Sequence, residues 1–478
     1  MLILKKDVSY ALNYALNKGF QIHPNALKIL EDIDAKELKR IIKEIVREKT
    51  RQKRFLIDQD DLEIVLGIKG DQSIENEHRV LFDPSSKITS AEGVSGFNAL
   101  FSNRFSKLKR IVSNRPEAKM LKSIASIIAA KSNNDMYVCG LVSERNSERN
   151  VTKLLIDDAS GSLETIVFDK NLQKTANQLL VDQFVMLKVR MGRNGGFITR
   201  DVIVPDVPDH FSNRSETEAY AVFLSDLHVG SKYFMKKEFE DFISWLSSPD
   251  PIARKVRFVI LGGDVVDGIG IYPNQDKELE CPTVEEQLEK LEEVLTKIPK
   301  NIKLFIVPGN HDPGRRALPQ PSFPKKYNQS LRKHENFFLI GNPSLVSLNG
   351  VKVLIYHGQS IDDIVKTTPG LSYDDPTKVM RQLLKSRHLS PIYGSQTPIA
   401  PETEDMMVID EIPDIFHVGH VHVVGFDMYR GVLLINSGTW QKQTPFQASV
   451  GLSPTPGLAV LVNLKTFKVY YRDFKTEN

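Results

Sequence analysis

Five short motifs in the last 260 or so residues carry side chains that can bind metal ions. They are Asp226-Leu227-His228, Gly263-Asp264, Gly309-Asn310-His311-Asp312, His357-Gly358 and Gly419-His420-Val421-His422. Each motif follows an apolar run typical of a strand, and loops at the carboxyl ends of strands in α/β sheets gather ligands. The sequence therefore predicts that the five motifs meet in one site.

The residue types suit a pair of divalent cations. Asp226 and His228 are two residues apart, so both side chains point to the same side if strand geometry continues. The two oxygens of Asp264 can bridge two ions, Asn310 offers a neutral oxygen, and the histidines offer imidazole nitrogens. Two such ions neutralise a phosphate ester and activate water. We expect two divalent ions, manganese foremost, with iron, zinc or nickel also compatible with these ligands.

A degenerate site that kept the fold and lost its ions is the main alternative. A lone motif of this kind would be an ordinary loop. Here every expected ligand type is present and all five motifs come in order, which favours an intact hydrolytic site.

The rest of the chain must position this site, and its 478 residues predict two to four domains. We expect a multidomain α+β protein. Residues 1–66 show helical periodicity, and residues 67–115 are expected to form a flexible linker followed by an amphipathic helix whose phenylalanines pack on the next domain. Residues 116–210 and 211–478 form the remaining two domains.

Residues 116–210 contain five strand-like runs with a helical stretch between the third and the fourth. This order is that of the OB-fold barrel. Such barrels bind single-stranded nucleic acid through aromatic side chains in a basic groove. Since aromatic residues are few here, a structural or partner-docking role is the other interpretation.

Residues 211–478 alternate apolar strands with helical segments, which predicts stacked sheets flanked by helices, a four-layer α/β/β/α domain. The segment 361–412 reads as an insertion that forms a lid or a partner surface.

Composition narrows the remaining possibilities. The net charge is +3, so nucleic-acid contact must come from local patches. Cys139 and Cys281 are the only cysteines, which gives no disulfide framework. The N-terminal apolar run is too short for a signal peptide, and no stretch approaches a membrane span. We expect a cytoplasmic protein without membrane contact.

The five motifs resemble those of the calcineurin-like metallophosphoesterase superfamily over residues 219–450. The resemblance implies that Asp226, His228, Asp264 and His422 bind one ion. It implies that Asp264, Asn310, His357 and His420 bind the other. It also implies that His311 is the general acid for the leaving oxygen and that Asp312 orients it.

The chain from residue 97 also resembles the small subunits of archaeal family D DNA polymerases. The strings 226–232, 384–394 and 436–447 and the order helical segment, OB barrel, phosphoesterase carry this resemblance. It implies 3′→5′ exonucleolytic proofreading, a large catalytic polymerase subunit as partner in a heterodimer, and primer-end or single-stranded DNA as substrate, with the sliding clamp as a further partner. A stand-alone phosphodiesterase or repair nuclease and a non-catalytic scaffold subunit are the alternatives.

Basic residues near the motifs are candidate contacts for the DNA backbone, which carries no sequence information. They are Lys232, Arg315, Arg316, Arg381, Lys385 and Arg387. Tyr356, Tyr393, Trp440 and Phe446 are candidates for stacking on a terminal base, with core packing as the alternative.

Overall fold

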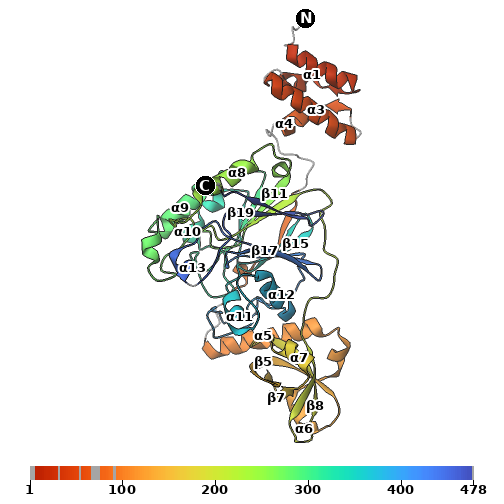
Figure 1. The fold of residues 1–478 in the computed structure, drawn as a ribbon, viewed down its shortest axis with the longest axis vertical. Coiled ribbons are helices and arrows are strands. Elements are labelled where there is room, and N and C mark those ends of the chain that lie inside the picture. Colours follow the sequence, from red (N-terminus) through yellow and green to blue (C-terminus); the bar gives the residue numbers. More distant parts are fainter. Residues whose placement is uncertain are drawn as a thin grey trace.

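The computed structural model describes residues 6–30, 33–52, 55–65, 76–89, 93–449 and 451–475. Three parts follow one another along the long axis of the molecule (Figure 1): a small helical unit, a large α/β domain and a barrel. The architecture is thus mixed α/β, as the sequence predicts. No helix among the described residues is both long and apolar enough to cross a membrane.

The N-terminal unit is a bundle of helices around one apolar core. The helices are α1 (Lys6–Asn17), α2 (Pro24–Leu30), α3 (Ala35–Gln52) and α4 (Gln59–Val65), and the short strands β1 (Gln21–Ile22) and β2 (Leu56–Ile57) pair in parallel. The apolar stripe expected along the third helix is buried at Leu38, Ile41, Ile42 and Ile45. Helical periodicity therefore predicted this unit correctly.

The second unit is a closed five-stranded barrel. Its strands are β5 (Met136–Glu148), β6 (Val151–Asp158), β7 (Gly161–Val167), β8 (Phe184–Met191) and β9 (Phe197–Ile203), with α7 (Lys170–Ala176) between β7 and β8. The antiparallel pairing of β5 with β8 closes the sheet on itself. The strand order and the position of the helix match the prediction, because alternation and turn residues mark each strand.

The large domain contains two sheets of six strands each. The first has the order β13-β12-β11-β10-β19-β20 and the second β17-β18-β16-β15-β14-β3. The strands of the first sheet are β10 (Tyr220–Leu224), β11 (Val256–Leu261), β12 (Lys303–Ile306), β13 (Phe337–Leu339), β19 (Leu458–Asn463) and β20 (Val469–Asp473). Those of the second are β3 (His78–Phe82), β14 (Ser344–Leu348), β15 (Val351–Tyr356), β16 (Ile415–Val418), β17 (Val424–Tyr429) and β18 (Val432–Ser437).

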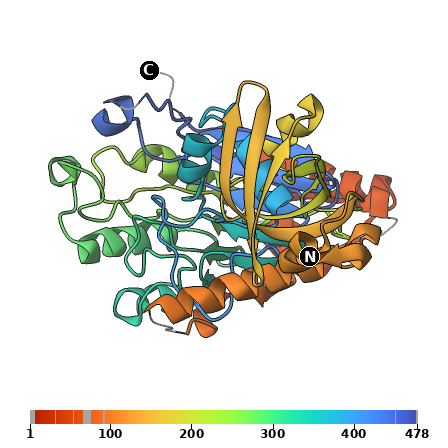
Figure 2. The ribbon, with the colours of Figure 1, turned by 90° about the horizontal axis from the view of Figure 1, so that it is seen from below.

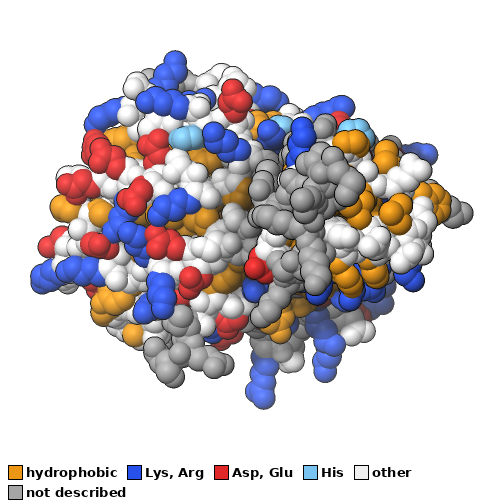
Figure 3. Space-filling view, turned by 90° about the horizontal axis from the view of Figure 1, so that it is seen from above, with side chains coloured by type: hydrophobic (Ala, Val, Ile, Leu, Met, Phe, Trp, Pro, Cys, Tyr) orange, Lys and Arg blue, Asp and Glu red, His pale blue; other side chains and the backbone are white. Residues whose placement is uncertain are grey.

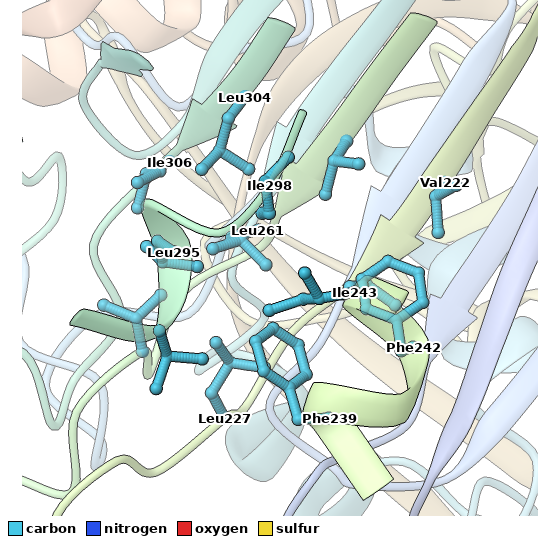
Figure 4. Close-up of a cluster of buried hydrophobic side chains, with 14 of the residues drawn as sticks. Val222, Leu227, Phe239, Phe242, Ile243, Leu261, Leu295, Ile298, Leu304 and Ile306 are labelled. Atoms are coloured by element: carbon cyan, nitrogen blue, oxygen red, sulfur yellow. The ribbon is translucent and has the colours of Figure 1, made fainter. Parts of the chain in front are cut away.

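Both faces of the first sheet are apolar, so its strands read as continuous hydrophobic runs. On β10, Ala221 and Phe223 belong to the core between the two sheets. Val222 faces the other way, into a core with Phe239 and Phe242 of α8 (Lys236–Leu246) and with residues of α9 (Val284–Leu295) (Figure 4). Strands buried on both faces hold the loops that follow them in fixed positions.

The segment 361–412 packs on the large domain and does not form the predicted lid, while its role as a partner surface stays a prediction. Its helices α11 (Ile361–Thr367) and α12 (Pro376–Ser386) cover the outer face of the second sheet. Ile361, Met380 and Leu383 are fully buried and belong to the same core cluster as Phe416 of β16. Pro369 and Gly370 lie in the loop between α11 and α12, Pro376 is the first residue of α12, and the other prolines of the segment follow α12.

The prediction of a flexible linker after residue 66 is wrong for residues 78–82. These residues form β3, which pairs antiparallel with β14 at the edge of the second sheet. None of the five side chains is buried: the two end residues are half-buried and the three between them are exposed. The segment therefore lacks the alternation of buried and exposed residues that marks a strand. Residues 67–75 and 90–92 of the predicted linker lie outside the described residues.

Helix α5 (Gly93–Val112) runs between the barrel and the large domain (Figure 2). Phe105 packs on Phe184 of the barrel with ring centroids 5.5 Å apart. Phe97 and Phe101 pack on Tyr393 of the large domain. The expected packing on the next domain is confirmed for Phe105, whereas Phe97 and Phe101 pack on the large domain, so the helix contacts both neighbours.

One buried ion pair fixes this helix to the large domain. Arg104 is fully buried. Its Nε donates to Oδ2 of Asp405 at 2.7 Å, and its Nη1 donates to the carbonyl oxygen of Pro391 at 2.7 Å. Nε2 of His388 lies 3.0 Å from the same carboxylate oxygen. Burial and the nearby Arg104 lower the pKa of His388 from 6.5 to about 4.

Acid is therefore expected to weaken the contact of α5. The unfolded chain binds a proton at His388 more readily than the folded chain, so stability is lost as the pH falls from about 6.5 to about 4, by about 2–3 kcal/mol. Urea unfolding at pH 7 and pH 4.5 measures this difference. The variant His388→Gln should show a smaller difference, and an equal pH dependence in both proteins would contradict the assignment.

Candidate metal centre

The five motifs occupy loops that directly follow five strands. Asp226 follows β10, Asp264 follows β11 and Asn310 follows β12, and these three strands are parallel neighbours. His357 follows β15 and the motif at 419–422 follows β16, its parallel neighbour in the other sheet. The carboxyl ends of parallel strands lie at one edge of a sheet, so both sheets present their motifs to a common site.

The predicted ligands form two groups. In the first, ligand atoms of Asp226, His228 and His422 all lie within 4.8 Å of one another. Oδ1 of Asp226 is 3.3 Å from Nε2 of His422, and the Nε2 atoms of His228 and His422 are 3.1 Å apart.

The second group is built in the same way. Ligand atoms of Asp264, His357 and His420 also lie within 4.8 Å of one another. Nε2 of His357 is 3.2 Å from Oδ2 of Asp264 and 3.0 Å from Oδ1 of Asn310. All seven side chains predicted as ligands thus point into two neighbouring clusters.

The atoms of the first group fit a cation better than they fit one another. Oδ1 of Asp226 is buried and accepts no hydrogen bond from the residues that the structure describes. A buried carboxylate oxygen without a partner is costly. The Nε2 atoms of His228 and His422 lie 3.1 Å apart. When both rings are neutral, at most one proton lies between these two nitrogens. Oxygen and imidazole ligands without thiolate fit manganese, iron, zinc or nickel.

The backbone at the ligands adopts a left-handed conformation that sequence analysis did not predict. The φ angles are 53° at Asp226, 52° at His228, 50° at Asp264, 69° at His420 and 60° at His422. Each such residue costs of order 1–3 kcal/mol. The two side chains of the first motif therefore converge because their loop turns twice, and not because strand geometry continues beyond Leu224 as predicted.

The glycines of the motifs make room for ligand side chains. A β-carbon on Gly309 would lie 2.2 Å from Oδ1 of Asp264, and one on Gly419 would lie 2.6 Å from Oδ2 of Asp226. At Gly263 it would lie 2.5 Å from Nδ1 of His357. These contacts explain why a glycine precedes each of Asp264, Asn310 and His420.

The variant Gly309→Ala is expected to lose metal binding. Its new methyl group would collide with both the carboxylate and the backbone nitrogen of Asp264, 2.2 and 2.5 Å away, so this loop must move. Metal content after dialysis against manganese should fall by at least half. Gly196→Ala is the matched control, because a β-carbon there meets nothing within 4 Å. Full metal content in Gly309→Ala would contradict the role of this close contact.

His311 lies beside the two groups, and its ring is held by a residue that sequence analysis missed. Nδ1 of His311 is 2.7 Å from the carbonyl oxygen of Asp267, so this nitrogen carries a proton and donates it. Nε2 then faces the metal ligands, 3.8 Å from Oδ2 of Asp264. The Asp267 carboxylate also contacts Nδ1 of His228 at 3.1 Å. The spacing of Asp267, three residues after Asp264, was the signal available in the sequence.

Asp312 has contacts other than those predicted. Its carboxylate accepts hydrogen bonds from the backbone nitrogens of Gly309, Val266 and Val265, at 2.8, 3.1 and 3.3 Å. It therefore joins the loop after β12 to the loop after β11, whereas Asp267 orients His311. Burial and the charge of Asp264 raise the pKa of Asp312 to about 7.

Electrostatics in the site favour positive charge near the carboxylates. Burial opposes charge on His357, but Asp264 and Asp226 outweigh it and raise its pKa to about 10. Burial lowers the pKa of His311 to about 4 despite the nearby Asp264. Since a histidine that binds a metal does so as neutral imidazole, a cation held by the second group would displace the proton of His357.

Two more residues that support the ligands were missed. Oδ2 of Asp362 lies 3.1 Å from Nε2 of His420, and the side-chain nitrogen of Gln447 lies 3.0 Å from Nδ1 of His422. Such partners fix the ring orientation of metal-binding histidines. Asp362 lies five residues after His357, in a segment that the sequence presented as an insertion.

The six basic residues predicted to contact DNA differ in their burial and in their partners. Arg387 is wrong as a DNA contact, because it is 3% exposed and donates to the carbonyls of Ile409 and Asp410. Arg387 ends α12 with its backbone in the left-handed conformation, at φ of 54°, and its charge gave no indication of this position. Lys385 and Arg381 line a cavity of about 320 Å³ between α12 and the barrel.

The other three basic residues lie in loops of the large domain. Arg316 is exposed, Lys232 donates to the carbonyl of Lys277, and Arg315 pairs with Glu402. On the face seen in Figure 3, Lys and Arg are interspersed with Asp and Glu, so no uniformly basic surface covers the visible described residues there.

The four aromatic candidates also differ in their environments. Tyr356 and Trp440 are fully buried, and Tyr393 packs against α5. Phe446 remains 40% exposed and stacks on Tyr272. Core packing thus accounts for the first two. Tyr393 is 42% exposed but packs on α5, whereas Phe446 stacks on Tyr272, whose ring is 6.4 Å from that of His311.

Comparison with known proteins identifies relatives over most of this chain. Residues 221–426 match the family of DNA polymerase alpha/epsilon B subunits. The DNA polymerase II small subunit of Archaeoglobus fulgidus is 40% identical over 385 residues, which cover 79% of this chain and 77% of the relative. The small subunit of Methanothermobacter thermautotrophicus is 37% identical, with 82% of each chain covered. A solved archaeal phosphodiesterase covers 53% of this chain and 98% of its own at 16% identity, with a TM-score of 0.29, which is too low to bear on function.

These relatives are 37–40% identical to this chain over more than three quarters of each sequence, so this chain belongs to the family of archaeal DNA polymerase II small subunits.

Proposed function

We propose that this chain is the small subunit of a heterodimeric archaeal replicative DNA polymerase and carries its 3′→5′ proofreading exonuclease. The observation that supports the nuclease most is the pair of adjacent clusters, each with a carboxylate and two histidines. A subunit that served only assembly would have no need of strained ligand loops or of a buried carboxylate oxygen, Oδ1 of Asp226, that accepts no hydrogen bond from the described residues. The names of the relatives support the large polymerase subunit as partner.

In this proposal Asp226, His228 and His422 would hold one divalent ion, Asn310, His357 and His420 would hold the other, and Asp264 would be shared between them. Two such ions would neutralise the phosphodiester and lower the pKa of a bound water, and manganese is the expected metal. The four-layer metallophosphoesterase fold provides the edge at which these residues meet.

His311 gives a proton to the leaving 3′ oxygen. The carbonyl of Asp267 holds the proton on Nδ1, so the transferred proton is the one on Nε2, which faces the site. With its pKa lowered to about 4, His311 is neutral near pH 7. The negative charge of a phosphodiester beside the ring raises that pKa and brings the acid form into the working range.

A 5′-labelled single-stranded oligonucleotide tests the proposal. With manganese, the purified chain or its complex with the large subunit should shorten the strand from the 3′ end in single-nucleotide steps, and EDTA should stop the reaction. Activity without association with a large subunit would indicate a stand-alone nuclease. If neither preparation cleaved the strand, the proposed nuclease activity would be contradicted, and the role of a non-catalytic scaffold subunit would remain.

A further inference from the structure

An apolar rim lies beside His311 in a site that is otherwise built from charged and polar groups. Phe446 is 40% exposed and Ile269 is 45% exposed. Ile269 follows Gly268, where a side chain would lie 2.2 Å from the carbonyl oxygen of His311. Exposed apolar side chains next to a phosphoesterase site contribute nothing to binding phosphate, so they point to a second part of the substrate.

Two aromatic rings form the flat part of this rim. The rings of Tyr272 and Phe446 are stacked, with centroids 5.0 Å apart and planes at 19°. The ring of Tyr272 is 6.4 Å from that of His311. The hydroxyl of Tyr272 donates to Glu278 at 3.0 Å, which fixes the ring. A base that stacks beside this pair would therefore leave the phosphate of its own nucleotide near His311.

The helix that carries Phe446 is tied to the metal ligands. Phe446 lies in α13 (Pro445–Ser449), and the next residue, Gln447, contacts Nδ1 of His422 at 3.0 Å. Thr444 and Gln447 also exchange two hydrogen bonds, from each backbone nitrogen to the other side chain, at 3.0 and 3.2 Å. A ring held in register with a metal ligand can position a substrate relative to the reacting bond.

We propose that Phe446 and Tyr272 form a stacking platform for the terminal nucleobase of a single-stranded 3′ end. This rests on the proposed exonuclease and adds its base-binding subsite. Every base has a π face, so stacking accepts any base, as an editing enzyme requires. A base paired within a duplex cannot lie on the platform until it is unstacked, so the platform favours frayed ends. Both residues position the substrate, and neither takes part in the chemistry.

Binding of a fluorescent strand end tests the platform separately from hydrolysis. The probe is a single-stranded oligonucleotide with 2-aminopurine as its 3′ nucleotide. It is added with manganese to the full-length chain carrying His311→Ala, so that the DNA stays intact. Stacking should quench the fluorescence of the base. Adding Phe446→Leu should reverse the quenching and raise Kd by about 5- to 150-fold, and Phe446→Trp should restore both.

Two controls separate stacking from a structural role. Tyr471→Leu removes a ring that is 63% exposed on β20, and it should leave Kd and quenching as they were. An oligonucleotide with an abasic 3′ end should bind weakly, and Phe446→Leu should weaken it no further. Equal losses on base-ended and abasic strands, or no loss on either, would overturn the platform. Since the measurement is binding, lack of hydrolysis by the unmodified chain would count against the exonuclease alone.

Discussion

The variant His311→Ala is expected to lose about 10²–10⁴-fold in kcat for single-stranded DNA while it keeps its metal ions. The ring lies beside both clusters, 3.8 Å from Oδ2 of Asp264, but it is not needed to complete either of the two ligand groups proposed above. Loss of the proton donor leaves substrate positioning and charge neutralisation in place. Single-turnover digestion together with metal content by mass spectrometry measures both quantities on the same protein.

The pH profile adds a check that a folding defect would not imitate. The acidic limb of kcat in the unmodified chain reflects groups other than the proton donor, and its alkaline limb should fall as His311 loses its proton. His311→Ala should lack that alkaline limb. If the variant lost its metal together with its activity, His311 would be a ligand and the assigned role would be wrong.

The variant Asp405→Ala is expected to lower the free energy of unfolding by about 3–5 kcal/mol. It removes the carboxylate that faces Arg104, and both side chains are only 1% exposed. Arg104 would then keep a buried charge whose remaining acceptors are backbone carbonyls. Urea unfolding followed by tryptophan fluorescence measures the loss.

Asp410→Ala is the matched control for this prediction. It breaks the ion pair between Asp410 and Arg110 of the same helix α5. The side chain of Arg110 is 65% exposed and that of Asp410 is 46% exposed. Solvent screens such pairs, so the loss should stay below about 1 kcal/mol. Equal losses in the two variants would show that Asp405 does not compensate a buried charge.

The residues of the candidate site could be predicted because their chemistry is local. A metal ligand is recognised by its type and by its place after an apolar strand, and both properties are visible in the sequence. The hydrophobic patterns likewise predicted the barrel and the N-terminal helices, since alternation and helical periodicity follow from which face of each element is buried.

What could not be predicted depends on contacts distant in sequence or on backbone conformation. Asp and His adopt left-handed angles more often than most residues, but residue type does not say which positions do so, as at Asp226 and His420. The resemblance implied that Asp312 orients His311, whereas its carboxylate accepts from the loop after β11. Arg387 looked like a DNA contact because charge suggests exposure, but two carbonyls and the end of α12 hold it inside.

Strand β3 shows the same limit at the level of the fold. Its five residues carry no alternation, and only the free edge of β14 gives them a partner. An added edge strand takes its stability from the sheet that it joins, so its own sequence need not encode it.

The most direct test of the proposed proofreading activity is digestion of a 5′-labelled primer–template with a mismatched 3′ end by the heterodimer, with and without Asp264→Asn in this chain. In the proposal Asp264 would be shared between the two ions, and the neutral asparagine amide would not neutralise their charge. The proposal predicts that the unmodified complex removes the mismatched nucleotide from the 3′ end in manganese and that Asp264→Asn reduces this by at least about 10³-fold, with polymerisation intact. Equal removal by both complexes would place the editing site elsewhere and contradict the proposal.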